Sequence, residues 1–200
     1  MTQTNNYWQE AFEQLQGTRL ATGRQQQLIT LLKASLFLGR TLCQQPELLQ
    51  LVLDKSMLVQ AISQPWLDPL SGIELTDEAA VFSSLRRYRN RALALLLTAD
   101  IYQLQNTEQG LARVSSLADC LINSAYQWAY QLQQQQNGTP YDEHDKPMPM
   151  QILGMGKLGG AELNFSSDID LIFTYPGHGE TRGGRRALEH QQFFTKVGRN

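Results

Sequence analysis

The apolar residues in the first two-thirds of the chain recur at intervals of three and four, which places them along one face of an α-helix. Helices are therefore predicted over residues 24–44, 47–62, 81–104 and 108–136. A shorter helix is predicted before them by apolar residues at the same spacing around Trp8. The pattern stops at Gly138 and Pro140, in the order in which helices commonly end. Strands do not fit this spacing, because their side chains alternate between two faces. Residues 1–147 are accordingly expected to form a helical N-terminal region without strands.

The character of the sequence changes after Pro140. The segment YDEHDKPMPM is polar and contains two prolines, so residues 141–150 are interpreted as a linker. Next, QILGMGKLGG is apolar and ends in glycines, which is typical of a buried strand entering a tight turn. The β-branched and aromatic run IDLIFTY predicts a second strand over Ile169–Tyr175. The predicted fold class is α+β, with a second domain beginning near residue 148 and covering residues 148–200.

Charge and cysteine content exclude several classes of protein. Seventeen Lys and Arg against nineteen Asp and Glu give a formal net charge of −2, without the basic excess of a non-specific nucleic-acid binder. Two cysteines, Cys43 and Cys120, are too few for a disulfide framework and are expected to be reduced thiols in the core. The longest aliphatic run, Leu93–Leu97, is far shorter than the ~20 residues of a membrane span. We therefore expect a cytoplasmic protein that binds neither nucleic acid nor a membrane.

The segment Gly154–Gly159 matches the G-x-G-x-x-G pattern of dinucleotide-binding folds, but its surroundings do not. Only eight residues, 161–168, separate the glycines from the next predicted strand, whereas a parallel crossover needs about a dozen or more. A phosphate-binding P-loop is excluded because Lys157 is followed by Leu158 rather than by Ser or Thr. Both of these nucleotide-binding folds are rejected.

Asp168 and Asp170 are the strongest candidates for chemistry. Residues two apart on a strand project from the same face, so the two carboxylates are expected to lie side by side. Two such anions repel each other unless a cation lies between them, and carboxylates are the expected ligands of Mg²⁺ beside substrate phosphates. The alternate residues Ile169 and Leu171 are expected to point into apolar packing. An isolated Asp-x-Asp is more often a solvated turn or strand end, but the flanking residues favour a site here.

The residues just upstream suit phosphate binding. Gly159 and Gly160 allow a ligand to approach the backbone and can present N–H groups to phosphate oxygens. Ser166 and Ser167 add hydroxyl donors, and Lys157 is a candidate counter-charge. Together with the carboxylates, these residues predict metal-dependent phosphoryl or nucleotidyl transfer.

The stretch ILGMGKLGGAELNFSSDIDLIFTY closely resembles the signature of glutamine synthetase adenylyltransferases, which have a polymerase-β-like nucleotidyltransferase fold. LRRYRNRALALLL and SLADCLINSAYQWAY resemble the helical part of the same family more loosely. The resemblance implies Mg²⁺ bound by Asp168 and Asp170, ATP, ADP and phosphate as ligands, glutamine synthetase as the protein substrate, and PII signal-transduction proteins as partners. The sequence around Glu162–Asp170 is similar to that of the first of the family's two catalytic modules, the one nearer the N-terminus. That module removes AMP from a tyrosine by phosphorolysis and releases ADP.

The sequence departs from the family in one respect. The third acidic residue of the family's metal site lies in a Val-Asp-x-Arg-Leu-Arg type segment, and no such segment occurs in the 200 residues. We therefore expect an N-terminal fragment of a longer enzyme, inactive in isolation. Two alternatives remain open at this stage: the module adds AMP from ATP, or the fragment is a docking module without catalytic activity.

Overall fold

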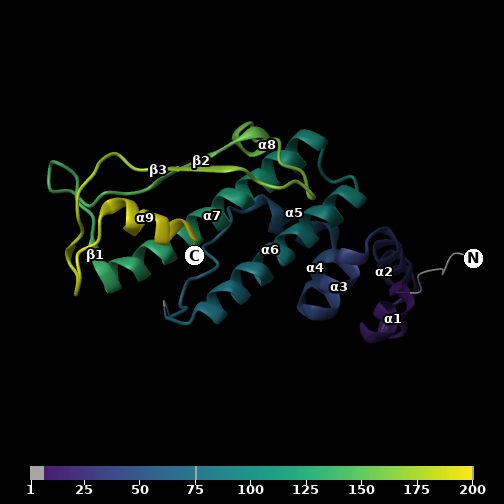
Figure 1. The fold of residues 1–200 in the computed structure, drawn as a ribbon. Helices are drawn as coiled ribbons and strands as arrows, with labels where there is room; N and C mark the ends of the chain where they lie inside the picture. The colour runs from purple at the N-terminus through teal and green to yellow at the C-terminus, as the bar shows by residue number, and fades with distance from the viewer. Residues whose placement is uncertain (1–6, 75, 200) are drawn as a thin grey trace, which may run out of the picture. The chain divides into compact units, whose positions relative to one another are not determined.

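The computed structural model describes residues 7–74 and 76–199, which form two compact units (Figure 1). Of the described residues, the first unit contains 7–66 and 87–114, and the second contains 67–74, 76–86 and 115–199. The division does not coincide with the predicted boundary at residues 147 and 148. That boundary separates a mostly helical part from a strand-containing part, and as a division of function it stays a prediction.

The first unit is a cluster of short helices. Its elements are α1 (Tyr7–Gln14), the 3₁₀ turn η1 (Gly17–Arg19), α2 (Thr22–Ala34), α3 (Leu36–Gln44), the 3₁₀ turn η2 (Pro46–Leu48), α4 (Leu49–Leu53) and α5 (Lys55–Ser63). The predicted helices over 24–44 and 47–62 are each interrupted. Ser35 and Asp54 adopt extended backbone conformations and cap the next helix: Ser35 Oγ accepts from Leu38 N–H at 3.2 Å, and Asp54 Oδ1 accepts from Ser56 N–H at 2.9 Å. The helical spacing of apolar residues continues through both breaks, so the sequence pattern did not predict them.

Two long helices contribute to both units. They are α6 (Glu78–Ile101) and α7 (Thr107–Asn137), close to the predicted 81–104 and 108–136. A reciprocal cap begins α7: Asn106 Oδ1 accepts from Gln109 N–H at 2.8 Å, and Gln109 Oε1 accepts from Asn106 N–H at 3.1 Å. No helix in residues 7–74 and 76–199 is both long and apolar enough to cross a membrane.

The strands belong to the second unit and are short. β2 (Gln151–Gly154) pairs antiparallel with β3 (Leu171–Thr174), and β1 (Gly138–Thr139) pairs antiparallel with β4 (Arg182–Gly183). The helices α8 (Gly156–Gly159) and α9 (His190–Arg199) complete the unit. A mostly helical chain with small antiparallel sheets agrees with the predicted α+β class. The expectation that residues 1–147 contain no strand is wrong, because the chain turns at Gly138 (φ +82°) and pairs with β4.

The predicted linker is an ordered connection. Tyr141 and Pro147 form an isolated bridge, and Asp142 Oδ1 accepts backbone N–H bonds from His144 and Lys146 at 2.8 and 2.9 Å. The pKa of the Asp142 carboxyl is lowered by these bonds, most of all by the one from the Lys146 N–H. A polar, proline-bearing composition thus fits a closed loop as well as a flexible linker.

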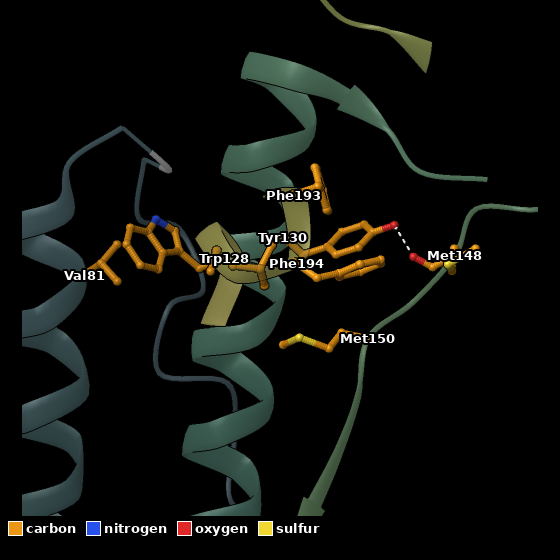
Figure 2. Close-up of a cluster of buried hydrophobic side chains, with 9 residues drawn as sticks. Val81, Trp128, Tyr130, Met148, Met150, Phe193 and Phe194 are labelled. Atoms are coloured by element: carbon orange, nitrogen blue, oxygen red, sulfur yellow. Dashed lines mark hydrogen bonds between the residues drawn. The ribbon is translucent and has the colours of Figure 1, made fainter. Parts of the chain in front are cut away.

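The core of the second unit joins α7, α9 and the chain leading into β2 (Figure 2). Tyr130 Oη donates to the Met148 carbonyl at 2.7 Å, and its ring lies edge-on to Phe193 with centroids 5.4 Å apart. One turn earlier on α7, Tyr126 Oη accepts from Met150 N–H at 3.0 Å. These two bonds fasten the chain on both sides of Pro149, so that β2 starts from a fixed position on α7.

Candidate functional site

Two of the three glycines of the G-x-G-x-x-G match, Gly154 and Gly159, lie where the end of β2 packs against α8. A Cβ on Gly154 would lie 2.9 Å from Leu158 Cγ, and a Cβ on Gly159 would lie 2.5 Å from the Gly154 carbonyl oxygen. Gly156 has a φ of +53°, in the left-handed region that favours glycine. Because β2 and β3 are antiparallel, the parallel crossover of a dinucleotide-binding fold is absent from this part of the described chain, which confirms the rejection of that fold.

The N–H groups of the Gly159–Gly160 pair are used within the chain. Gly159 N–H donates to the Met155 carbonyl at 3.3 Å, and Gly160 N–H donates to the Gly156 carbonyl at 3.1 Å. Both were expected to face phosphate, and in this arrangement they do not, because the pair closes the end of α8 instead of lying in an open loop. Gly160 still leaves space: a Cβ there would have its nearest neighbour, the Gly156 carbonyl oxygen, at 3.7 Å.

A hydrogen-bonded chain of side chains links α8 to the turn that precedes β3. Lys157 Nζ donates to Ser167 Oγ at 3.2 Å, and Ser167 Oγ donates to Asn164 Oδ1 at 2.6 Å. Ser167 N–H also donates to the Asn164 carbonyl at 3.3 Å and closes the turn. The structure thus brings together the predicted residues Lys157 and Ser167, whereas Ser166 is exposed at the tip of the turn. Asn164 was not predicted as a site residue, since only folding shows that its amide faces Ser167.

Asp168 and Asp170 lie in the segment that leads into β3, and both are exposed. The strand begins at Leu171, two residues later than predicted. A single bond, from Met155 N–H to the Asp170 carbonyl at 2.9 Å, continues the pairing to Asp170. Ile169 was expected to pack in the interior, but it is 41% exposed, because α8 has begun opposite it and offers no strand to pair with. Both carboxylates are therefore open to solvent, within reach of ligands.

The two faces of the β2–β3 pair differ. Leu153 and Ile172 are directly opposed and about half exposed, so the face that carries them is open to solvent. The other face includes Gly154 and Leu171, and between it and α7 lies a groove of about 250 Å³ that Asp119 and Tyr126 also line. By the alternation of side chains, Asp170 belongs to the same side as Ile172, away from this groove.

Comparison with known proteins decides the family. The family model for glutamate-ammonia ligase adenylyltransferase (GlnE) matches residues 25–200. The chain belongs to this family.

Curated relatives within the family include proteins called bifunctional glutamine synthetase adenylyltransferase/adenylyl-removing enzyme. The chain is similar to that of Shewanella frigidimarina, with 43% identity over 183 residues, which cover 90% of this chain and 19% of the relative. The relative from Alteromonas mediterranea is 49% identical over 141 residues, which cover 68% of this chain and 14% of the relative. That from Shewanella loihica is 42% identical over 96% of this chain and 20% of its own length. The chain thus spans about a fifth or less of these family members, and the predicted family is confirmed.

The family resemblance implies Mg²⁺, and the donors present fit that ion. The described residues contain no group of three or more His, Cys, Asp or Glu side chains placed to hold a metal. Mg²⁺ commonly keeps several waters and binds one or two protein carboxylates together with substrate phosphates. Two exposed carboxylates, Asp168 and Asp170, match this mode and do not match a closed structural site.

The cysteines lie outside this site. Cys43 and Cys120 are free, and partial burial raises the pKa of both thiols. A raised pKa keeps each thiol protonated and a weak nucleophile at neutral pH. This agrees with the expectation of reduced thiols, although both cysteines are only partly buried and do not lie in the core as expected.

Proposed function

We propose that the chain supplies part of a nucleotidyltransferase site that controls glutamine synthetase by moving AMP to or from one of its tyrosines. The observation that carries the proposal is the exposed Asp168 and Asp170 pair next to the Lys157–Ser167 contact, in a family whose members are named for this reaction. The fold of this region is proposed to be the first half of a polymerase-β-like nucleotidyltransferase domain.

Each predicted residue has a role in this proposal. Asp168 and Asp170 would hold Mg²⁺, which when bound supplies positive charge beside phosphate oxygens. The Lys157 ammonium has three N–H groups and gives one to Ser167, so two remain for phosphate oxygens. Ser166 offers an exposed hydroxyl, and Gly160 leaves the space for a phosphate to approach the backbone. Gly159 acts indirectly, by allowing α8 to close against β2.

The module is proposed to remove AMP. In that reaction an oxygen of inorganic phosphate attacks the phosphorus of the AMP group, the bond from phosphorus to the tyrosine oxygen breaks, and the tyrosine oxygen takes up a proton. The products are ADP and unmodified tyrosine. PII signal-transduction proteins are the proposed regulatory partners, the cytoplasm is the proposed location, and ATP is the AMP donor in the alternative, adenylylating direction.

Product analysis tests this proposal. Adenylylated glutamine synthetase is incubated with the full-length protein, Mg²⁺ and phosphate, and unmodified glutamine synthetase is incubated with ATP in parallel. The removing module predicts phosphate-dependent release of ADP that is lost when Asp168 is replaced by Asn. If that replacement abolishes the release of pyrophosphate from ATP and leaves ADP release unchanged, the module is the adenylylating one. If it alters neither product while the chain still binds glutamine synthetase, the region is a docking module.

A further inference from the structure

The hydrogen bonds around Ser167 have fixed directions. An ammonium group can only donate, so Ser167 Oγ is the acceptor of the bond from Lys157. A hydroxyl has one proton, and Ser167 gives it to Asn164 Oδ1 at 2.6 Å. The Ser167 hydroxyl therefore both donates and accepts a hydrogen bond. Its proton points at Asn164, and one of its two lone pairs points at Lys157.

We propose that Asn164 is a positioning residue of the phosphate-binding site, an inference that rests on the proposed function. By accepting the hydrogen bond from the Ser167 hydroxyl, the Asn164 amide oxygen turns a lone pair of that hydroxyl toward Lys157. The Lys157 ammonium is thereby held beside the segment that leads into Asp168, with its two other N–H groups available to inorganic phosphate. Ser167 holds Lys157 in position, and Lys157 donates hydrogen bonds to phosphate.

Other contacts hold the same loop in place, which separates this role from a structural one. Leu158 and Leu163 are buried, and Leu163 N–H donates to Ser115 Oγ of α7 at 3.0 Å. Asn164 itself is exposed. Loss of its amide therefore leaves the anchors of the loop intact and releases only the Ser167 hydroxyl and the Lys157 ammonium.

The test measures the binding of inorganic phosphate without turnover. The melting temperature of the full-length protein with Mg²⁺ is followed as phosphate is added, which gives an apparent Kd. Asn164→Ala and Ser167→Ala are each expected to weaken phosphate binding about tenfold, the effect of one net hydrogen bond. Because both act through Lys157, the double variant should weaken it no further. Asn123→Ala, which removes an exposed amide from α7, is the matched control and should leave the Kd unchanged.

Kinetics provide a second readout that a purely structural residue would not give. Asn164→Ala should raise the KM for phosphate by a similar factor and change kcat little. Unchanged phosphate binding in Asn164→Ala, or fully additive losses in the double variant, would overturn the proposal, as would a wild-type protein that binds no phosphate. A wild-type protein that binds phosphate in this Asn164-dependent way but releases no ADP would refute the removing reaction and support the positioning role.

Discussion

Replacing Gly159 by alanine should destabilise the fold, whereas replacing Gly160 by alanine should not, although the two residues are neighbours with the same predicted role. A Cβ on Gly159 would lie 2.5 Å from the Gly154 carbonyl oxygen, a backbone atom that cannot rotate away. At Gly160 the nearest atom would be at 3.7 Å, an ordinary contact. Neither glycine has a positive φ, so steric space alone distinguishes them.

The magnitude follows from these distances. To bring the new Cβ of Gly159→Ala to 3.0 Å from that oxygen, the end of β2 and α8 must separate by about half an ångström. Overpacking of this kind commonly costs about 1–3 kcal/mol of unfolding free energy. A displacement of about 1 Å near a reacting centre can reduce a rate about a hundredfold, so half that displacement should cost roughly tenfold. Gly160→Ala should leave stability unchanged within about 0.5 kcal/mol.

Urea denaturation and phosphate-dependent ADP release, measured on both variants of the full-length protein, test this reasoning. We expect Gly159→Ala to lose both stability and activity. Gly160→Ala should keep its stability and raise the KM for phosphate, since the new methyl group occupies the space proposed for the ligand. Native-like stability and activity in Gly159→Ala would refute the packing argument, and normal phosphate kinetics in Gly160→Ala would refute the role of Gly160.

The remaining predictions concern stability and solubility. Tyr130→Phe leaves the Met148 carbonyl without its buried donor and should lower the free energy of unfolding by about 1–3 kcal/mol in urea. Burial raises the pKa of Tyr130, so the contribution of its hydroxyl to stability should be complete below about pH 10 and decline above it. Melting curves from about pH 8 to 11 should show this decline, and Tyr130→Phe should reduce it. Ser35→Ala removes the cap of α3 and should cost about 0.5–2 kcal/mol, whereas no change on denaturation would contradict the assigned cap. Leu153 and Ile172 are exposed on an open two-stranded sheet, so the 200-residue chain should aggregate, and light scattering should fall when both are replaced by Thr. Unchanged light scattering in the double Thr variant would contradict this expectation.

The sequence predicted the long helices and the two strands around the glycine-rich turn, because their periods are properties of neighbouring residues. It missed the breaks at Ser35 and Asp54, where a capping side chain outweighs a continuing apolar pattern. It also missed β1, whose pairing with β4 joins residues more than forty positions apart. A pattern among neighbouring residues cannot predict a strand partner that is so distant in the sequence.

That the predicted residues form one site stays a prediction. Lys157 and Ser167 lie in hydrogen-bond contact although they are ten positions apart in the sequence. The roles assigned to the backbone of Gly159 and Gly160 differed, because the sequence does not show that α8 uses their N–H groups. Ile169 was expected to be buried by the alternation of strand side chains, and the strand begins only after it. Each difference arises where one element ends and another begins.

The proposed function requires that Asp168 and Asp170 hold the metal needed for AMP removal. The most direct test is the rate of phosphate-dependent ADP release at increasing Mg²⁺ for Asp168→Asn, Asp170→Asn and the matched control Asp119→Asn, an exposed carboxylate of α7. Loss of a metal ligand removes several kcal/mol of charge stabilisation in the transition state. The rate of ADP release by each of the first two variants should therefore fall by at least about a hundredfold, with an unchanged melting temperature. The control should match the wild type. Near-normal, Mg²⁺-dependent release by either Asp168→Asn or Asp170→Asn would contradict the assignment of the metal site.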